Sequence, residues 1–115
     1  MSREIKFRVW DNVRNKMWEW NMVSRDIDLG NILSGKSNLK PLQFTGLKDK
    51  NGVDIYEGDV FWSDHSGEYT YVEYSEGAFY IVHVVTSEKT LLYREHGDWI
   101  VKGNIYENKN LLEEK

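Results

Sequence analysis

Few residues in this chain are of types and spacing that suit catalysis or metal binding, and the first candidates are two carboxylate–imidazole pairs. Asp64 precedes His65, and His96 lies two residues before Asp98. Imidazole and carboxylate groups bind zinc and manganese, so these four side chains would form a metal site if the fold brought both turns together. The favoured interpretation is that they are ordinary surface residues of turns. We therefore predict no metal and no other cofactor, and a metal-dependent enzyme is the least favoured alternative.

The other motifs give even less support for catalysis. His83 lies in an apolar stretch, which is typical of a core or barrel-lining histidine, and no serine lies in a Gly-x-Ser-x-Gly motif. The spacing of Gly46, Gly52 and Gly58 does not match a phosphate-binding loop, so we predict that these residues and Gly103 are structural turn glycines. The chain has no cysteine and hence no disulfide or thiolate metal site. We predict that the protein is not an enzyme.

Alternation of apolar and polar residues predicts short β-strands. Residues 4–10 and 17–23, joined by a polar turn, indicate an N-terminal hairpin, and a short strand follows Pro41 at residues 42–45. Residues 53–56, 60–62, 69–74 and 78–85 continue as a meander whose last member, the most apolar, is expected to be the central strand. Residues 91–94 and 99–101 predict a final hairpin, and the tail from Asn108 predicts one helical turn. Residues 24–40 fit a short helix or a loop equally well.

The length of 115 residues suits a single domain over residues 1–115. Several short strands with turns between them indicate a mainly β fold with little helix, a small barrel or roll of antiparallel strands. The amino-terminal residues do not resemble a signal peptide, and no apolar run is long enough to cross a bilayer. We therefore expect a cytoplasmic protein that does not interact with membranes.

The aromatic content is the unusual feature of the composition, with sixteen Trp, Tyr and Phe residues. Packing across strands is the favoured explanation, followed by a protein interface, and base stacking on single-stranded nucleic acid comes last. For an interface, the predicted interaction surface comprises Trp10, Trp18, Trp20, Tyr69 and Tyr71. For nucleic acid, the neighbouring cations are Lys6, Arg8, Lys16 and Arg25. The net charge of −4 makes nucleic acid the less favoured partner, because phosphate neutralisation dominates non-specific binding.

Three segments together resemble the YopX family of phage and prophage proteins. The first is residues 3–11 (REIKFRVWD), with Lys16-Met17 shortly after. The second is residues 43–52 (QFTGLKDKNG) continuing with residues 55–60 (IYEGDV), and the third is residues 103–108 (GNIYEN) followed by Leu111-Leu112. Lys109 stands where proline is frequent in the family, and Trp18-Glu19-Trp20 is more aromatic than expected. The resemblance implies a β-rich domain with an SH3-like barrel in a bacterial host cell that carries a phage or prophage. It implies no catalytic residues.

These observations favour a phage or prophage accessory protein that acts as a non-enzymatic protein-interaction or self-associating module. Its expected partner is a second copy of the chain or a host or phage protein, bound through the aromatic surface and a free strand edge. A single-stranded nucleic-acid-binding β-barrel is the alternative.

Overall fold

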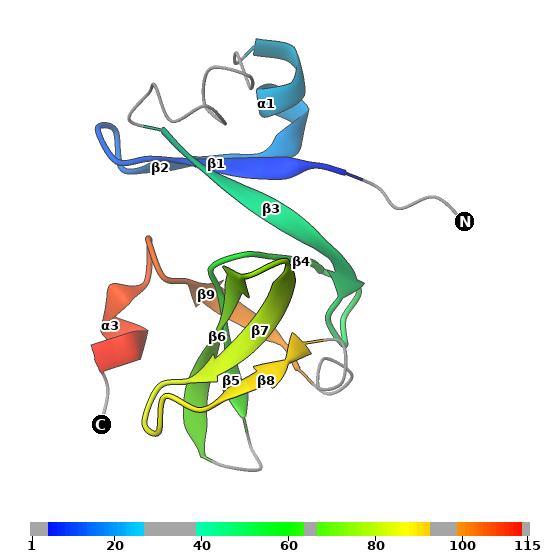
Figure 1. The fold of residues 1–115 in the computed structure, drawn as a ribbon. Coiled ribbons are helices and arrows are strands. Elements are labelled where there is room, and N and C mark those ends of the chain that lie inside the picture. The colour runs from blue at the N-terminus through cyan, green and yellow to red at the C-terminus, as the bar shows by residue number, and fades with distance from the viewer. Residues whose placement is uncertain (1–4, 27–38, 64–66, 93–98, 114–115) are drawn as a thin grey trace. The chain divides into compact units, whose positions relative to one another are not determined.

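The computed structural model describes residues 5–26, 39–63, 67–92 and 99–113, and its chain divides into two compact units (Figure 1). The N-terminal unit is Met1–Phe44 and the C-terminal unit is Thr45–Lys115. Each unit has its own cluster of buried apolar residues. A single domain over residues 1–115 would require the two units to fold together, and this stays a prediction.

The N-terminal unit is built on the predicted hairpin, which is confirmed. β1 (Phe7–Asp11) and β2 (Lys16–Trp18) pair in antiparallel register, with Val9 opposite Trp18. The first residues of β3 (Leu39–Lys48) pair with the other side of β1. Val9 is fully buried, and together with Val23 it forms the small core of this unit.

The predicted strand over residues 17–23 is wrong beyond Trp18. The chain leaves β2 and forms the helix α1 (Trp20–Asp26), whose first bonds run from the N–H groups of Met22 and Val23 to the Glu19 carbonyl oxygen, both at 3.0 Å. Trp20 and Val23 are three residues apart, a helical spacing, and both belong to the cluster around Val9. Packing of this pair against β1 outweighs the alternation that predicted a strand.

The structure assigns the two ends of the segment 24–40, for which the sequence did not distinguish a short helix from a loop. Residues 24–26 end α1, residues 39 and 40 begin β3, and residues 27–38 lie outside the described residues. β3 starts earlier than predicted and runs through Pro41, which is opposite Val9 of β1. A strand donates only every second N–H to one neighbour, so proline fits at a position whose nitrogen points away from that neighbour.

The C-terminal unit contains a five-stranded antiparallel sheet that curls into a half-barrel (Figure 1). Its strand order is β8-β7-β6-β5-β9, and β4 (Asp54–Tyr56) adjoins β3. The five strands are β5 (Asp59–Ser63), β6 (Glu68–Ser75), β7 (Ala78–His83), β8 (Lys89–Leu91) and β9 (Val101–Asn104). The mainly β, antiparallel fold class with little helix is therefore confirmed, and the SH3-like classification stays an expectation.

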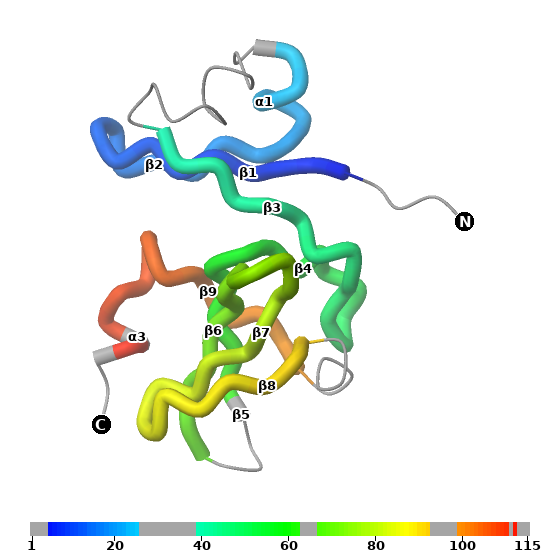
Figure 2. The backbone as a smooth tube through the Cα atoms, in the orientation of Figure 1, coloured from blue at the N-terminus to red at the C-terminus, as the bar shows by residue number. Residues whose placement is uncertain are grey.

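Two predicted details of this sheet are wrong. β7 ends at His83 and is second from the edge, whereas β6 is the middle strand. The predicted hairpin of residues 91–94 and 99–101 does not form, because β8 pairs with β7 and β9 pairs with β5 at the opposite edge (Figure 2). Sequence neighbours usually pair, but here β8 and β9 lie at opposite edges of the sheet. Residues 93–98, between these two strands in the sequence, lie outside the described residues.

The core of the C-terminal unit lies on the inner face of this sheet. Phe61, Val72 and Ile81 occupy neighbouring positions on β5, β6 and β7, and all three are buried. The Phe61 ring lies 5.4 Å from the ring of Trp99, centroid to centroid. Burial of a large aromatic or aliphatic side chain contributes roughly 1.5–3 kcal/mol to folding, so these residues account for much of the stability of the unit.

The short helix α3 (Lys109–Glu113) follows β9, at the place where one helical turn was predicted, and it contacts β6. Neither α1 nor α3 approaches the length of a membrane-crossing helix, and the described part of the chain contains no other helix that could span a bilayer.

Candidate interaction surface

The register of the five-stranded sheet places four aromatic side chains on its outer face. Phe61 is opposite Thr70 and points to the core, so the alternate row, in which Trp62 is opposite Tyr69, faces outward. The same alternation turns Tyr71 of β6 and Tyr80 of β7 outward. We call these four residues, Trp62, Tyr69, Tyr71 and Tyr80, the outer aromatic strip.

The strip combines an apolar base with partly exposed rings. Val60 and Val82 lie on either side of Tyr71 in the ladder and are buried although they face outward. Trp62 is 37% exposed, and its ring meets that of Tyr69 edge to face, with centroids 4.9 Å apart. Rigid rings that have an apolar body and a polar edge are enriched in the centres of protein interfaces.

An ion pair also lies on this face. The Lys89 ammonium is 3.2 Å from the Glu73 carboxylate, and both side chains are partly exposed. Glu73 is opposite Tyr80, so the pair flanks the strip. A solvated pair of this kind contributes about 0–1 kcal/mol, and it supplies the polar rim that surrounds an interface core.

The predicted surface residues Trp10, Trp18 and Trp20 belong to the N-terminal unit and are used differently. Trp10 is buried, and Trp18 and Trp20 pack against the core cluster around Val9. The Trp18 indole N–H donates to the Asp11 carboxylate at 3.3 Å. Of the five residues predicted to form an interface, the structure places Tyr69 and Tyr71 side by side on one outer face and gives the three tryptophans packing roles in the other unit.

Two predicted nucleic-acid-contacting cations lie over aromatic rings. The Lys16 ammonium is 4.2 Å from the centroid of the Trp18 ring, and that of Lys6 is 4.7 Å from the centroid of the Phe44 ring. Arg25 contacts the Met22 sulfur at 3.6 Å, and Arg8 is half-buried. A stacked base would need ring faces that these lysines occupy.

Asp11 organises the β1–β2 turn of the N-terminal unit. Its carboxylate accepts hydrogen bonds from the backbone N–H groups of Val13 and Arg14 at 3.0 and 3.1 Å, and from the Arg14 side chain at 3.0 Å. Burial acts to raise the pKa of this carboxyl, but the bonds from Arg14, Trp18 and Val13 outweigh it and lower the pKa from 3.8 to about 2. Asp11 is therefore a structural anion.

Asp49 has a similar role in the C-terminal unit, where it organises a loop by accepting backbone N–H groups. Its carboxylate accepts N–H bonds from Asn51 at 2.9 Å, Val53 at 2.8 Å and Val101 at 3.0 Å. Burial acts to raise the pKa of Asp49, but these backbone bonds dominate and hold it below its usual value. The loop from Lys48 is thereby tied to β9.

His83, the histidine that lies within the described residues, contacts a carboxylate. His83 Nδ1 lies 3.1 Å from a Glu68 carboxylate oxygen, and the other oxygen accepts the N–H of Val85 at 3.1 Å. Residues 5–26, 39–63, 67–92 and 99–113 contain no group of three or more His, Asp or Glu side chains placed to hold a metal ion. The predicted metal candidates, Asp64, His65, His96 and Asp98, lie outside the described residues.

The second and third motif segments meet in one corner of the C-terminal unit. The Ile105 N–H donates to the Gly58 carbonyl at 2.8 Å, and the Gly58 N–H donates to Val72 at 2.9 Å. Gly58 has φ +90°, and a Cβ there would come 3.4 Å from the ring of Tyr106. Burial and, secondarily, the negative charge of Glu57 raise the pKa of the Tyr106 phenol.

The side-chain oxygen of Asn104 completes this corner, because it accepts the N–H groups of Tyr106 at 3.0 Å and Glu107 at 2.8 Å. A Cβ at Gly103 would overlap the Asn108 side chain, so this position requires glycine for space. Gly46 and Gly52, the other two predicted turn glycines, have φ +90° and +84°. The polar groups around Asn104 bind one another, so this part of the unit has a structural role.

Sequence analysis missed Trp62 and Tyr80 as surface residues. Both lie in apolar stretches, and the period-2 pattern does not say which of the two faces meets the core. Tyr69 and Tyr71 could have revealed them. These tyrosines alternate on one face of β6, so the positions opposite them on β5 and β7 lie on the same outer face.

A model of the YopX protein family matches residues 6–113 of the chain, a range that covers most of both units. Among solved structures, the crystal structure of protein EF1440 from Enterococcus faecalis resembles the chain with a TM-score of 0.65 and 25% sequence identity. The similarity covers 96% of this chain and 99% of that one. No curated protein matches the sequence.

Proposed function

The chain belongs to the YopX family, and on that premise we propose that it is a non-enzymatic protein-interaction module that binds through the outer aromatic strip. The observation that carries the proposal is the exposure of Trp62 beside Tyr69 on an outer sheet face that also presents Tyr71 and Tyr80. Aromatic side chains of this kind dominate the energetics of protein interfaces.

Three side chains of types that catalysis uses have structural contacts elsewhere in the molecule. Asp11 and Asp49, two strongly bonded carboxylates, accept backbone N–H groups and hold turns in place. His83 is engaged with Glu68 at the end of β7, and its face of the sheet is opposite to that of the strip. A non-enzymatic role is consistent with both observations.

The setting that we propose follows from the family resemblance. The protein acts as an accessory protein of a phage or prophage in the cytoplasm of a bacterial host. Its partner is a second copy of the chain or a protein of the host or phage. An exposed aromatic strip serves either case, because it binds by burying ring area and does not require a charged counterpart.

The first test is the mass of the protein in solution by light scattering, alone and after incubation with lysate of the bacterial host. We expect a defined oligomer or a new stable complex. In the Trp62→Ser variant this species should be lost, since serine removes the most exposed ring of the strip. Thermal denaturation followed by circular dichroism checks that the variant stays folded.

Val53→Ser is the matched control, because Val53 is a 49% exposed apolar residue outside the strip. It should leave the oligomer or complex unchanged. A wild-type protein that is strictly monomeric and captures nothing argues against the proposal, and so does a Trp62→Ser variant that associates like the wild type. Salt-dependent binding to a single-stranded oligonucleotide, in place of protein association, would support the nucleic-acid alternative.

A further inference from the structure

The C-terminal unit has an apolar hollow that is open to solvent on one side. Its volume is about 240 Å³. The lining comes from the end of β3, from the start of β7 and from β8 with the residue after it: Thr45, Leu47, Ala78, Phe79, Leu91 and Leu92. None of these residues belongs to the outer aromatic strip, although Leu91 is opposite Tyr80 of the strip in the β7–β8 ladder. The inference about the hollow therefore rests on Leu47, Ala78 and Phe79, which lie away from the strip residues in the register, and it goes beyond the proposed function.

The size of the hollow limits what it can hold. An engineered apolar cavity of about 150 Å³ binds benzene, whereas pockets for drug-sized ligands and cofactors measure about 300–1,000 Å³. The hollow lies between these two cases. It has room for one large apolar side chain and too little room for a cofactor.

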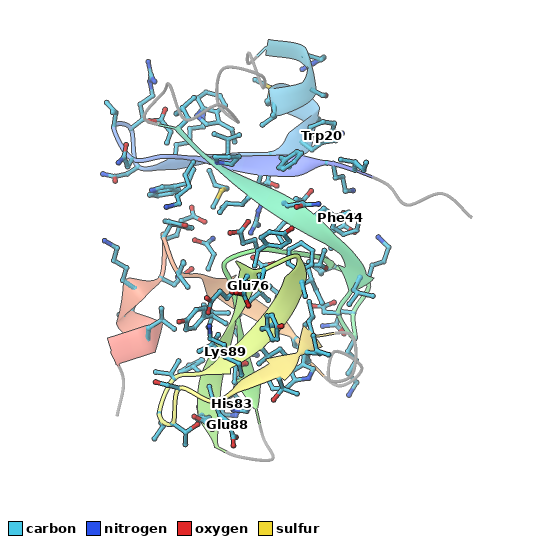
Figure 3. The ribbon with its side chains drawn as sticks, viewed as in Figure 1. Trp20, Phe44, Glu76, His83, Glu88 and Lys89 are labelled. Atoms are coloured by element: carbon cyan, nitrogen blue, oxygen red, sulfur yellow. The ribbon has the colours of Figure 1, made fainter. Side chains whose placement is uncertain are left out.

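An aromatic ring and a carboxylate of the β6–β7 hairpin lie close in the chain to the lining residues Ala78 and Phe79. Tyr74 is 45% exposed, and its ring meets that of Phe79, a lining residue, edge to face at 5.0 Å. Glu76 lies two residues before the lining residue Ala78, at the exposed tip of the β6–β7 hairpin (Figure 3). Within the described ranges, no cation pairs with the Glu76 side chain.

The charge of the whole unit has the same sign as this carboxylate. Thr45–Lys115 contains seven Lys/Arg and fourteen Asp/Glu, a net charge of −7. A negative domain attracts basic segments and repels acidic ones, which sets partner choice and association rate. An exposed aromatic ring such as that of Tyr74 adds a favourable site for a cation.

We propose that the hollow is a docking pocket for a segment of a protein partner that presents one bulky apolar side chain next to a lysine or arginine. The apolar side chain fills the space between Phe79, Leu91 and Leu92. The neighbouring cation lies near Glu76 and the Tyr74 ring. The hollow contributes apolar area, and the carboxylate selects for the adjacent positive charge.

The experiment is an NMR titration of the full chain with three blocked tetrapeptides, Gly-Phe-Arg-Gly, Gly-Ser-Arg-Gly and Gly-Phe-Glu-Gly, at low ionic strength. We expect the first peptide to cause saturable shifts of the Phe79 and Leu91 amides, with millimolar affinity. The second lacks the apolar side chain and the third has the wrong charge, so both should bind at least several-fold more weakly.

Variants then separate the pocket from its charge. Ala78→Leu fills the hollow from its partly exposed edge and should abolish the shifts. Glu76→Lys should weaken binding of the first peptide roughly 3- to 10-fold, an effect that salt reduces. The matched control is Glu88→Lys, because Glu88 is also an exposed carboxylate but lies at the opposite end of β7 from Glu76 (Figure 3).

Three results would overturn the proposal: no shift at the hollow at millimolar peptide, shifts confined to the outer aromatic strip, or equal effects of Glu76→Lys and Glu88→Lys. A wild-type oligomer that Ala78→Leu dissociates, without any peptide binding, would instead identify a second copy as the occupant and would also contradict the proposed partner chemistry. Because Ala78→Leu and Trp62→Ser alter different surfaces, failure here leaves the proposed function intact.

Discussion

The two units of the molecule use their aromatic residues in different ways. In the N-terminal unit Trp18 and Trp20 pack against Val9, and Lys16 lies over the Trp18 ring. In the C-terminal unit the aromatics divide between the core, with Phe61 and Trp99, and the outer strip. The units also differ in charge, since Met1–Phe44 carries a net +3, with eight Lys/Arg and five Asp/Glu, against −7 for the rest of the chain.

This difference teaches that aromatic content does not locate an interface by itself. The N-terminal unit has three of the five tryptophans within eleven residues, and the structure gives them packing roles. The strip is spread over three strands and forms only when the sheet is assembled. Four variants test this contrast.

Phe61→Ala should have the largest effect. Phe61 is fully buried against Trp99, and truncation of such a ring costs about 3–5 kcal/mol. If the chain is one domain, urea denaturation should show a single, weakened transition in which β1 is lost together with the C-terminal sheet. Protected β1 amides in a C-terminal unit that has already unfolded would show that the two units are independent domains.

Gly58→Val should be next, with a loss of about 1–3 kcal/mol, because valine is strained at φ +90° and would press on Tyr106. Gly52→Val is the matched variant, since Gly52 has φ +84° with open space around it. It should cost less, and the difference between the two melting temperatures reports the contact with Tyr106. Equal melting temperatures would contradict the packing role of Gly58.

Asp11→Asn should change how stability depends on pH. The folded-state pKa of about 2 lies below the ordinary aspartate value of 3.8, so the charged carboxylate stabilises the fold above about pH 4, and this contribution is lost as the pH falls through 2. The variant should be less stable at pH 7 and less sensitive between pH 4 and 2. Acid titrations followed by circular dichroism measure both, and identical pH profiles would show that the Asp11 bonds contribute nothing.

Trp62→Ser should have the smallest effect on stability, about 0.5–1.5 kcal/mol from its contact with Tyr69. The same substitution should have the largest effect on association. Trp20→Ser is the comparison in the N-terminal unit, where we expect loss of stability without a specific loss of binding. If Trp20→Ser abolishes association while the protein stays folded, the contrast between the units is wrong.

Much of the fold could be predicted from the sequence because local signals agree with it. The alternation at residues 4–10 predicts a strand that overlaps β1, and the turns at Gly52, Gly58 and Gly77 separate strands where the structure has them. The helix at Trp20 was missed because a seven-residue segment carries too few apolar positions to distinguish period 2 from period 3.6.

The partners of β8 and of β9 could not be predicted, for a different reason. Which strand lies at which edge depends on long-range packing around Phe61, and no local pattern near Leu91 or Val101 encodes it. The candidate site shows the same limit. Tyr69 and Tyr71 were found because they alternate within one strand, whereas Trp62 and Tyr80 join them only through cross-strand register.

The most direct test of the central claim is photo-crosslinking in the bacterial host. A benzoyl-phenylalanine side chain is placed at Tyr71, in the middle of the strip, and in a second variant at Val53, outside it. We predict one discrete crosslinked species, either a dimer of the chain or a single partner protein, from position 71 and none from position 53. Equal crosslinking from both positions, or none from position 71, would contradict the claim that the outer aromatic strip is a binding surface.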